Sequence, residues 1–73
     1  MSILPILSAR EVLRRLHQAG FRVVSQRGSH IKLWNPTTGH RTGVPFHNVD
    51  IGRNLLSKIL KQAGLSMQEF IDL

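Results

Sequence analysis

The stretch from Ser25 to Trp34, SQRGSHIKLW, joins two segments of alternating apolar and polar residues through the turn signal Arg27-Gly28. A period of two is typical of strands that bury one face. In the second segment, Ile31 and Leu33 fall on the face expected to be buried. The opposite face then carries His30, Lys32 and Trp34. This hairpin decides the fold, because it requires an antiparallel sheet with one face for a core and one face open to solvent.

The segments around this hairpin complete the sheet. In the first strand, Phe21 and Val23 are expected on one face. The expected residues of its opposite face are Arg22, Val24 and Gln26. Residues 35–40 read as a loop, and residues 41–46 as a weaker third strand whose proline indicates an edge or a strand end. Residues 47–52 are expected to be a polar connection.

Three helices flank the sheet in the sequence. The first begins at a capping box, Ser8–Glu11, and Gly20 is its expected C-terminal stop. The second is the most regular, with an apolar stripe that begins after Asn54, its expected N-cap, and ends before Gly64. A second capping box, Ser66–Glu69, starts a short last helix.

These elements predict a small α+β fold in the order helix, three antiparallel strands, helix and short C-terminal helix. Each long helix has one apolar stripe and the sheet has one apolar face, so both helices are expected to pack together on that face. A chain of 73 residues buries only about 60% of its unfolded surface and cannot divide its core. We therefore expect a single domain over residues 1–73.

The chain is strongly basic. Ten Lys and Arg residues against four Asp and Glu residues give a formal net charge of +6, which predicts attraction to a polyanion or to an acidic protein.

The absence of cysteine excludes disulfides, thiolate nucleophiles and Cys-based zinc sites. No segment reaches the roughly 18 continuous apolar residues of a membrane span, and the opening MSILPILS lacks the basic start of a signal peptide. We expect a cytoplasmic protein with no membrane partner.

Four short motifs occur in order along the chain. They are Gly20-Phe21, RGSH at Arg27–His30, VPFH at Val44–His47 and ILKQAGLSMQEF at Ile59–Phe70. The ordered set resembles the HicA toxins of bacterial HicA–HicB toxin–antitoxin modules. The resemblance implies a double-stranded-RNA-binding-domain-like fold and a ribonuclease that cleaves mRNA without the ribosome, using the histidine of Gly-Ser-His, which is His30 here. It also implies a HicB antitoxin as the silencing partner.

The chemistry of RNA cleavage fits these residue types. A base must take the proton of the 2′-hydroxyl, an acid must protonate the leaving 5′-oxygen, and positive charge must stabilise the phosphate. Histidine suits both proton transfers, because its ordinary pKa near 6.5 leaves both forms available at neutral pH, and His30 is the candidate catalytic residue. The candidate substrate-binding residues are Arg27, Gly28, Ser29, Lys32 and Trp34. Gly28 would allow close approach, Lys32 would neutralise the phosphorane, and Trp34 would either stack a base or cover the sheet edge.

The second proton-transfer group is open among His47, His40, Lys32 and water, with water or Lys32 favoured. His47 fits a loop anchor better than a catalyst, and His40 looks like a loop residue. The spacing of the histidines matches no compact zinc motif and the acids show no paired pattern, so no metal or other cofactor is expected.

Two other classes of function remain open. The fold order and charge also suit a non-catalytic module that binds double-stranded RNA by its shape. Alternatively, the chain acts mainly as a protein-interaction unit for an acidic antitoxin. The basic residues of the two long helices fit either a phosphate-binding band or ordinary solvated faces. They are Arg10, Arg14, Arg15, Arg53, Lys58 and Lys61.

Overall fold

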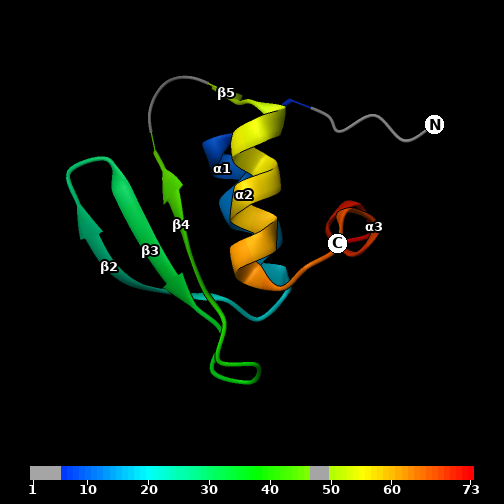
Figure 1. Cartoon of the computed structure of the whole chain (residues 1–73). Coiled ribbons are helices and arrows are strands. Elements are labelled where there is room, and N and C mark those ends of the chain that lie inside the picture. The colour runs from blue at the N-terminus through cyan, green and yellow to red at the C-terminus, as the bar shows by residue number, and fades with distance from the viewer. Residues whose placement is uncertain (1–5, 47–49) are drawn as a thin grey trace.

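The computed structural model of the chain describes residues 6–46 and 50–73 (Figure 1). Its elements are β1 (Leu7–Ser8), α1 (Ala9–Gln18), β2 (Arg22–Arg27), β3 (His30–Trp34), β4 (Arg41–Pro45), β5 (Asp50–Ile51), α2 (Arg53–Ala63) and α3 (Met67–Ile71). The predicted order of helix, three strands, helix and short helix is confirmed, and two short strands are added to it. Within the described ranges, no helix is long and apolar enough to cross a membrane.

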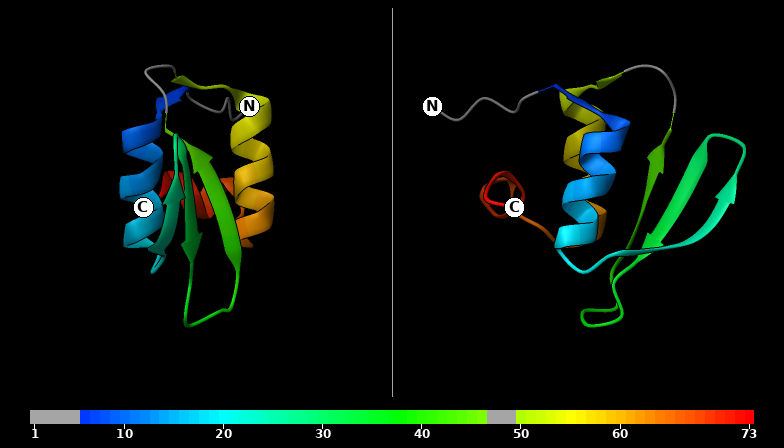
Figure 2. Two further views of the ribbon diagram at one scale, coloured as in Figure 1. Left: turned by 90° about the vertical axis from the view of Figure 1, so that its left-hand side faces the viewer. Right: turned by 180° about the vertical axis from the view of Figure 1, so that it is seen from behind.

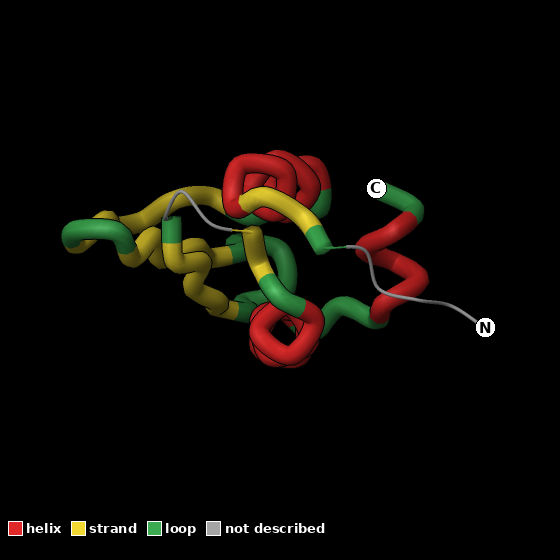
Figure 3. The backbone as a smooth tube through the Cα atoms, turned by 90° about the horizontal axis from the view of Figure 1, so that it is seen from above, coloured by secondary structure: helices red, strands yellow, loops and turns green. Residues whose placement is uncertain are grey.

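The elements stack in three layers. β2, β3 and β4 form an antiparallel sheet with β3 in the centre. Both α1 and α2 lie on one side of this sheet, and α3 lies beyond them on the side of the helix layer that is remote from the sheet (Figures 1 and 2). Figure 3 shows the same order of layers from above. This arrangement is the small α+β, double-stranded-RNA-binding-domain-like fold that the sequence predicts.

The core lies between the sheet and the helices. Its largest fully buried side chains are Phe21, Phe70, Leu16, Leu33, Ile51, Leu56, Ile59, Val12 and Val44. Phe70 comes from α3, which Arg15 of α1 holds in place. The Arg15 guanidinium lies 5.4 Å from the centre of the Phe70 ring, and its Nη1 donates to the carbonyl oxygens of Phe70 and Ile71 at 3.3 Å. Arg15 therefore has a structural role, and α3 completes the core from the far side.

A second, two-stranded sheet joins the starts of the two long helices. β1 pairs antiparallel with β5, with Leu7 opposite Ile51 and Ser8 opposite Asp50. The predicted polar connection over residues 47–52 was therefore wrong for Asp50 and Ile51, while residues 47–49 lie outside the described residues. The Ile51 side chain is buried and adds to the core. Because this pairing links segments far apart in the sequence, no local pattern indicated it.

The helix ends follow the predicted capping residues with one exception. Ser66 and Glu69 form a complete capping box, and Gly64 ends α2 in the left-handed conformation at φ 69°. Ser8 caps α1 by accepting from the Glu11 backbone N–H at 3.1 Å. The predicted N-cap Asn54 was wrong, because α2 begins at Arg53 directly after β5, and its N-cap is Gly52 in extended conformation. The pairing of β5 thus sets where this helix starts.

β2 departs from its predicted alternation. The Val23 side chain is 57% exposed, although it lies opposite the buried Leu33, because the helices cover β3 and β4 but not this edge strand (Figure 1). A bulge between Val23 and Ser25 then shifts the register, so that Ser25 opposes Lys32. A bulge puts one extra residue on one strand, which exchanges the faces of the residues after it. The predicted strict alternation, with Gln26 on the same face as Arg22, was therefore wrong.

Candidate nucleic-acid interface

Cross-strand pairing arranges the side chains of the sheet's open face into three rows. Directly opposed residues share a face with their Cβ atoms about 5 Å apart, and successive rows are about 7 Å apart along the strand. Counted from the β2–β3 turn, the first row is Arg27–His30–Pro45, the second Ser25–Lys32–Gly43 and the third Arg22–Trp34–Arg41. The intervening Ile31 and Leu33 are buried. The sequence-based placement of His30, Lys32 and Trp34 on the face away from the helices is therefore confirmed.

His30 begins β3 directly after the turn at Gly28-Ser29. Gly28 has φ 56° and nothing lies within 4 Å of where its Cβ would be, so glycine suits both the left-handed turn and the open space above it. The backbone carbonyl of Ser29 accepts from the Phe46 N–H, which ties the end of β4 to this turn. The His30 side chain is exposed, and its ring has no hydrogen-bond partner among the described residues. Its imidazole is therefore accessible from solvent, with Arg27 opposite it on β2.

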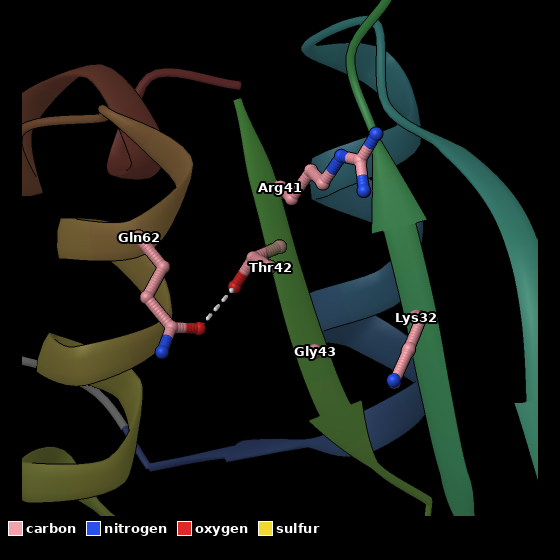
Figure 4. Close-up of a pocket in the computed structure, with 5 residues that line it drawn as sticks. All are labelled: Lys32, Arg41, Thr42, Gly43 and Gln62. Carbon is pink, nitrogen blue, oxygen red and sulfur yellow. Dashed lines mark hydrogen bonds between the residues drawn. The ribbon is translucent and has the colours of Figure 1, made fainter. Parts of the chain in front are cut away.

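An open hollow adjoins the second row. It is lined by Lys32, Arg41, Thr42, Gly43 and Gln62 (Figure 4). The Thr42 hydroxyl points away from the open face and contacts α2, since it lies 3.0 Å from the Ile59 carbonyl oxygen and 3.4 Å from Gln62 Oε1. Gly43 has no side chain to fill the space beside Lys32, which leaves the β4 backbone accessible there.

Trp34 occupies the middle of the third row. Its side chain is 36% exposed, and Arg22 and Arg41 oppose it from the two neighbouring strands. The next residue, Asn35, is buried and fixes the strand end. Its Nδ2 donates to the Ala19 carbonyl oxygen at 3.2 Å, and its Oδ1 accepts from the Thr37 N–H at 2.9 Å.

The histidines that the structure describes are not gathered in one place. His40 lies in the loop beyond the Trp34 end of β3, and that end is four residues, or about 13 Å, along the strand from His30. Its ring packs over Gly64, where an added Cβ would lie 2.6 Å from the ring atoms. His40 therefore supports the end of α2 and is too remote to act with His30, which removes it from the candidates for the second proton transfer. His47 lies outside the described residues, and within those residues no group of three His or acidic side chains is placed to hold a metal ion.

The charges are distributed unequally over the molecule. No Asp or Glu occurs in the sequence between Glu11 and Asp50, a span that includes the whole three-stranded sheet. The Glu11 carboxylate accepts from Arg14 and Arg15 on its own helix, and these hydrogen bonds lower its pKa to about 2. Two arginines of the predicted helix band are thus engaged within the fold. The cations of the sheet, in contrast, have no carboxylate on their own face.

The sequence did not single out Arg22, Arg41, Gly43 or Gln62 as site residues. Arg22 was placed on the open face by strand alternation, but its position opposite Trp34 depends on the register before the bulge. The other three depend on pairing between β3 and β4 and on the packing of α2 against β4, and no local sequence signal reports either.

Comparison with protein families matches residues 9–65 to the HicA toxins of bacterial toxin–antitoxin systems. The chain belongs to the HicA toxin family. A HicA toxin is one component of a toxin–antitoxin pair, so an antitoxin is its partner. Comparison with curated proteins gives no match. The matched range includes α1, the whole three-stranded sheet and α2 of this HicA chain, and therefore every residue of the open face.

Proposed function

We propose that the toxin is an endoribonuclease that cleaves mRNA independently of the ribosome, with His30 as its catalytic base or acid. The main support for the proposal is the position of His30. Its imidazole is exposed on a sheet face that bears Arg27, Lys32 and two further arginines and no carboxylate. Such a face attracts a phosphate backbone. Membership of the HicA family supports the assignment of a toxin.

The reaction follows from the chemistry of RNA. The neutral His30 imidazole accepts the proton of a 2′-hydroxyl, and the resulting oxygen nucleophile attacks the adjacent phosphorus. The bond to the 5′-oxygen breaks, which leaves a 2′,3′-cyclic phosphate on one fragment. The departing 5′-oxygen takes a proton from water or from Lys32 and becomes a hydroxyl. No metal ion is needed for these steps.

Positive charge on the open face supports the reaction. Lys32 lies one row, or about 7 Å, from His30 on the same strand, within reach of a phosphate held between them. Its ammonium would stabilise the negative charge that builds on the phosphorane oxygens. Arg27, opposite His30, would bind an adjacent phosphate. A single general acid–base residue contributes about 10²- to 10⁴-fold, which is sufficient for a slow toxin.

The antitoxin is proposed to be a HicB-type protein that covers the open face. An acidic surface placed over His30 would exclude RNA and complement the cations of the three rows. Such a complex would act in the cytoplasm, where mRNA is translated. A complex in which His30 stayed fully exposed would contradict inhibition by coverage.

The activity is tested with purified protein and a long unstructured RNA in excess chelator, analysed on a denaturing gel. Wild type is expected to cut the RNA, and His30→Ala to cut at least 100-fold more slowly. His17→Ala is the matched control, because His17 is an exposed histidine on α1, and it should cut as wild type does. Binding by all three proteins without any cutting would instead support the non-catalytic RNA-binding module.

A further inference from the structure

The third row of the open face combines an aromatic ring with two cations. Trp34 lies between Arg22 and Arg41, which oppose it from the two neighbouring strands. In residues 6–46 and 50–73, the cation found over an aromatic ring is Arg15 on Phe70, so neither neighbouring arginine is stacked on the indole. Trp34 is 36% exposed, which leaves part of the residue available to a ligand.

The position of Trp34 is fixed by its surroundings. Its strand is hydrogen-bonded on both sides, and the backbone N–H of Asn35 donates to the His40 carbonyl oxygen at 2.9 Å at the strand end. The buried Asn35 side chain anchors the same point to the end of α1 through Ala19. Because the backbone that carries the ring is held in this way, little backbone ordering is needed when a planar ligand stacks on Trp34, which favours binding.

We propose that the Arg22–Trp34–Arg41 row is a subsite for an unpaired nucleotide, whose base stacks on Trp34 while the two arginines bind the phosphates on either side of it. The inference deepens the proposed ribonuclease function and rests on it. The row lies two rows, or about 13 Å, from His30 along β3, so this nucleotide is not the one that is cut. Base stacking on an aromatic side chain requires a base whose face is free, and this condition selects single-stranded RNA over duplex RNA.

Trp34 reports on its own occupancy, because it is the only tryptophan of the chain and no tyrosine is present. The test measures tryptophan fluorescence of the His30→Ala protein as a short single-stranded RNA is added, and compares the same strand annealed to its complement. Saturable quenching by the single strand and little quenching by the duplex are expected. Equal quenching by both, or binding of the single strand in a mobility-shift assay without quenching, would overturn the proposal.

Further substitutions in the His30→Ala protein test how much each residue of the row contributes to RNA binding. Trp34→Leu is expected to weaken single-strand binding about 10- to 100-fold, and Trp34→Phe much less. Arg22→Gln and Arg41→Gln should each weaken binding and lower its dependence on salt. Leu55→Ala, which shortens an exposed apolar side chain on α2, is the control and should bind normally. Normal binding by folded Trp34→Leu would refute the subsite.

Cleavage and stacking can fail separately. If the wild type cuts RNA but its tryptophan fluorescence does not respond to a single strand, the subsite is wrong and the ribonuclease stands. If single strands quench Trp34 but no protein cuts, the subsite stands as a binding site and the catalytic proposal is wrong. If neither RNA form binds, both proposals are wrong.

Discussion

At the scale of single residues, Gly43 shapes the open face through the side chain that it lacks. A Cβ at this position would lie 3.7 Å from the Ile31 carbonyl oxygen, an ordinary contact distance. Gly43→Ala should therefore fold normally, with a stability change within about 0.5 kcal/mol. The added methyl would project beside Lys32 where the RNA backbone is proposed to lie, and we expect cleavage to fall about tenfold or more.

The Gly43→Ala experiment measures initial cleavage rates beside thermal unfolding curves. Gly52→Ala is the control, because an added Cβ at Gly52 would have no atom within 4 Å and Gly52 lies at the start of α2. Its cleavage rate should equal that of wild type. Full activity of Gly43→Ala would show that the substrate does not approach β4 at this point.

Two asparagines make a matched pair for stability. Asn35→Ala removes the acceptor of the Thr37 N–H and the donor to the Ala19 carbonyl oxygen, both at a buried residue. It should lower the free energy of unfolding by about 1–3 kcal/mol. Asn54→Ala should change it by less than about 0.5 kcal/mol, because the N-cap of α2 is Gly52. Urea denaturation measures the free energy of unfolding of both variants. A large loss of stability in Asn54→Ala would show that Asn54 caps the helix after all.

At the scale of elements, α1 carries a pH-sensitive cluster. Hydrogen bonds from Arg14 and Arg15 lower the pKa of Glu11 from its ordinary 4.5 to about 2 in the folded protein. A lowered pKa contributes stability that is present above about pH 4.5 and is lost as the pH falls toward 2. Glu11→Gln should therefore flatten the dependence of stability on pH in this range. Denaturant titrations at a series of pH values measure it, and an unchanged dependence would show that these ion pairs contribute nothing to stability.

The elements also show what a local pattern can and cannot predict. The capping residues Ser8 and Ser66 and the stop at Gly64 act on neighbours within four residues, so the sequence was enough to find them. The N-cap at Gly52 was missed because the non-local pairing of β1 with β5 decides it. The bulge in β2 was missed because alternation counts residues on one strand, whereas a bulge is defined by two strands together.

In the candidate site, too, a local pattern predicted part of the arrangement: which face a residue of β3 occupies, but not which residues lie beside it. Alternation within β3 was enough to place His30, Lys32 and Trp34 on one face, because Ile31 and Leu33 between them had to be buried. Which residues stand beside them depends on the partner strands. Arg41 and Gly43 therefore emerged only from the pairing of β3 with β4.

At the scale of the whole molecule, the open face and α1 offer RNA two different basic surfaces. The sheet carries cations without acids, whereas on α1 the Arg14 and Arg15 side chains bind Glu11. RNA should therefore bind the sheet in preference to α1. Lys32→Gln is expected to reduce the slope of log affinity against log salt by about 0.7, the contribution of one phosphate contact to a single strand. Arg10→Gln, which removes an equal charge from α1, should leave the slope unchanged, and the reverse result would move the RNA to the helices.

If His30 on the open face cleaves RNA by activating a 2′-hydroxyl, the chemistry of the fragment ends must show it. We would identify these ends by mass spectrometry after cleavage in excess chelator by wild type and by His30→Ala. We expect 2′,3′-cyclic phosphates and 5′-hydroxyls from wild type, and almost no fragments from the variant. Fragments with 3′-hydroxyls and 5′-phosphates, or equal cleavage by His30→Ala, would contradict it.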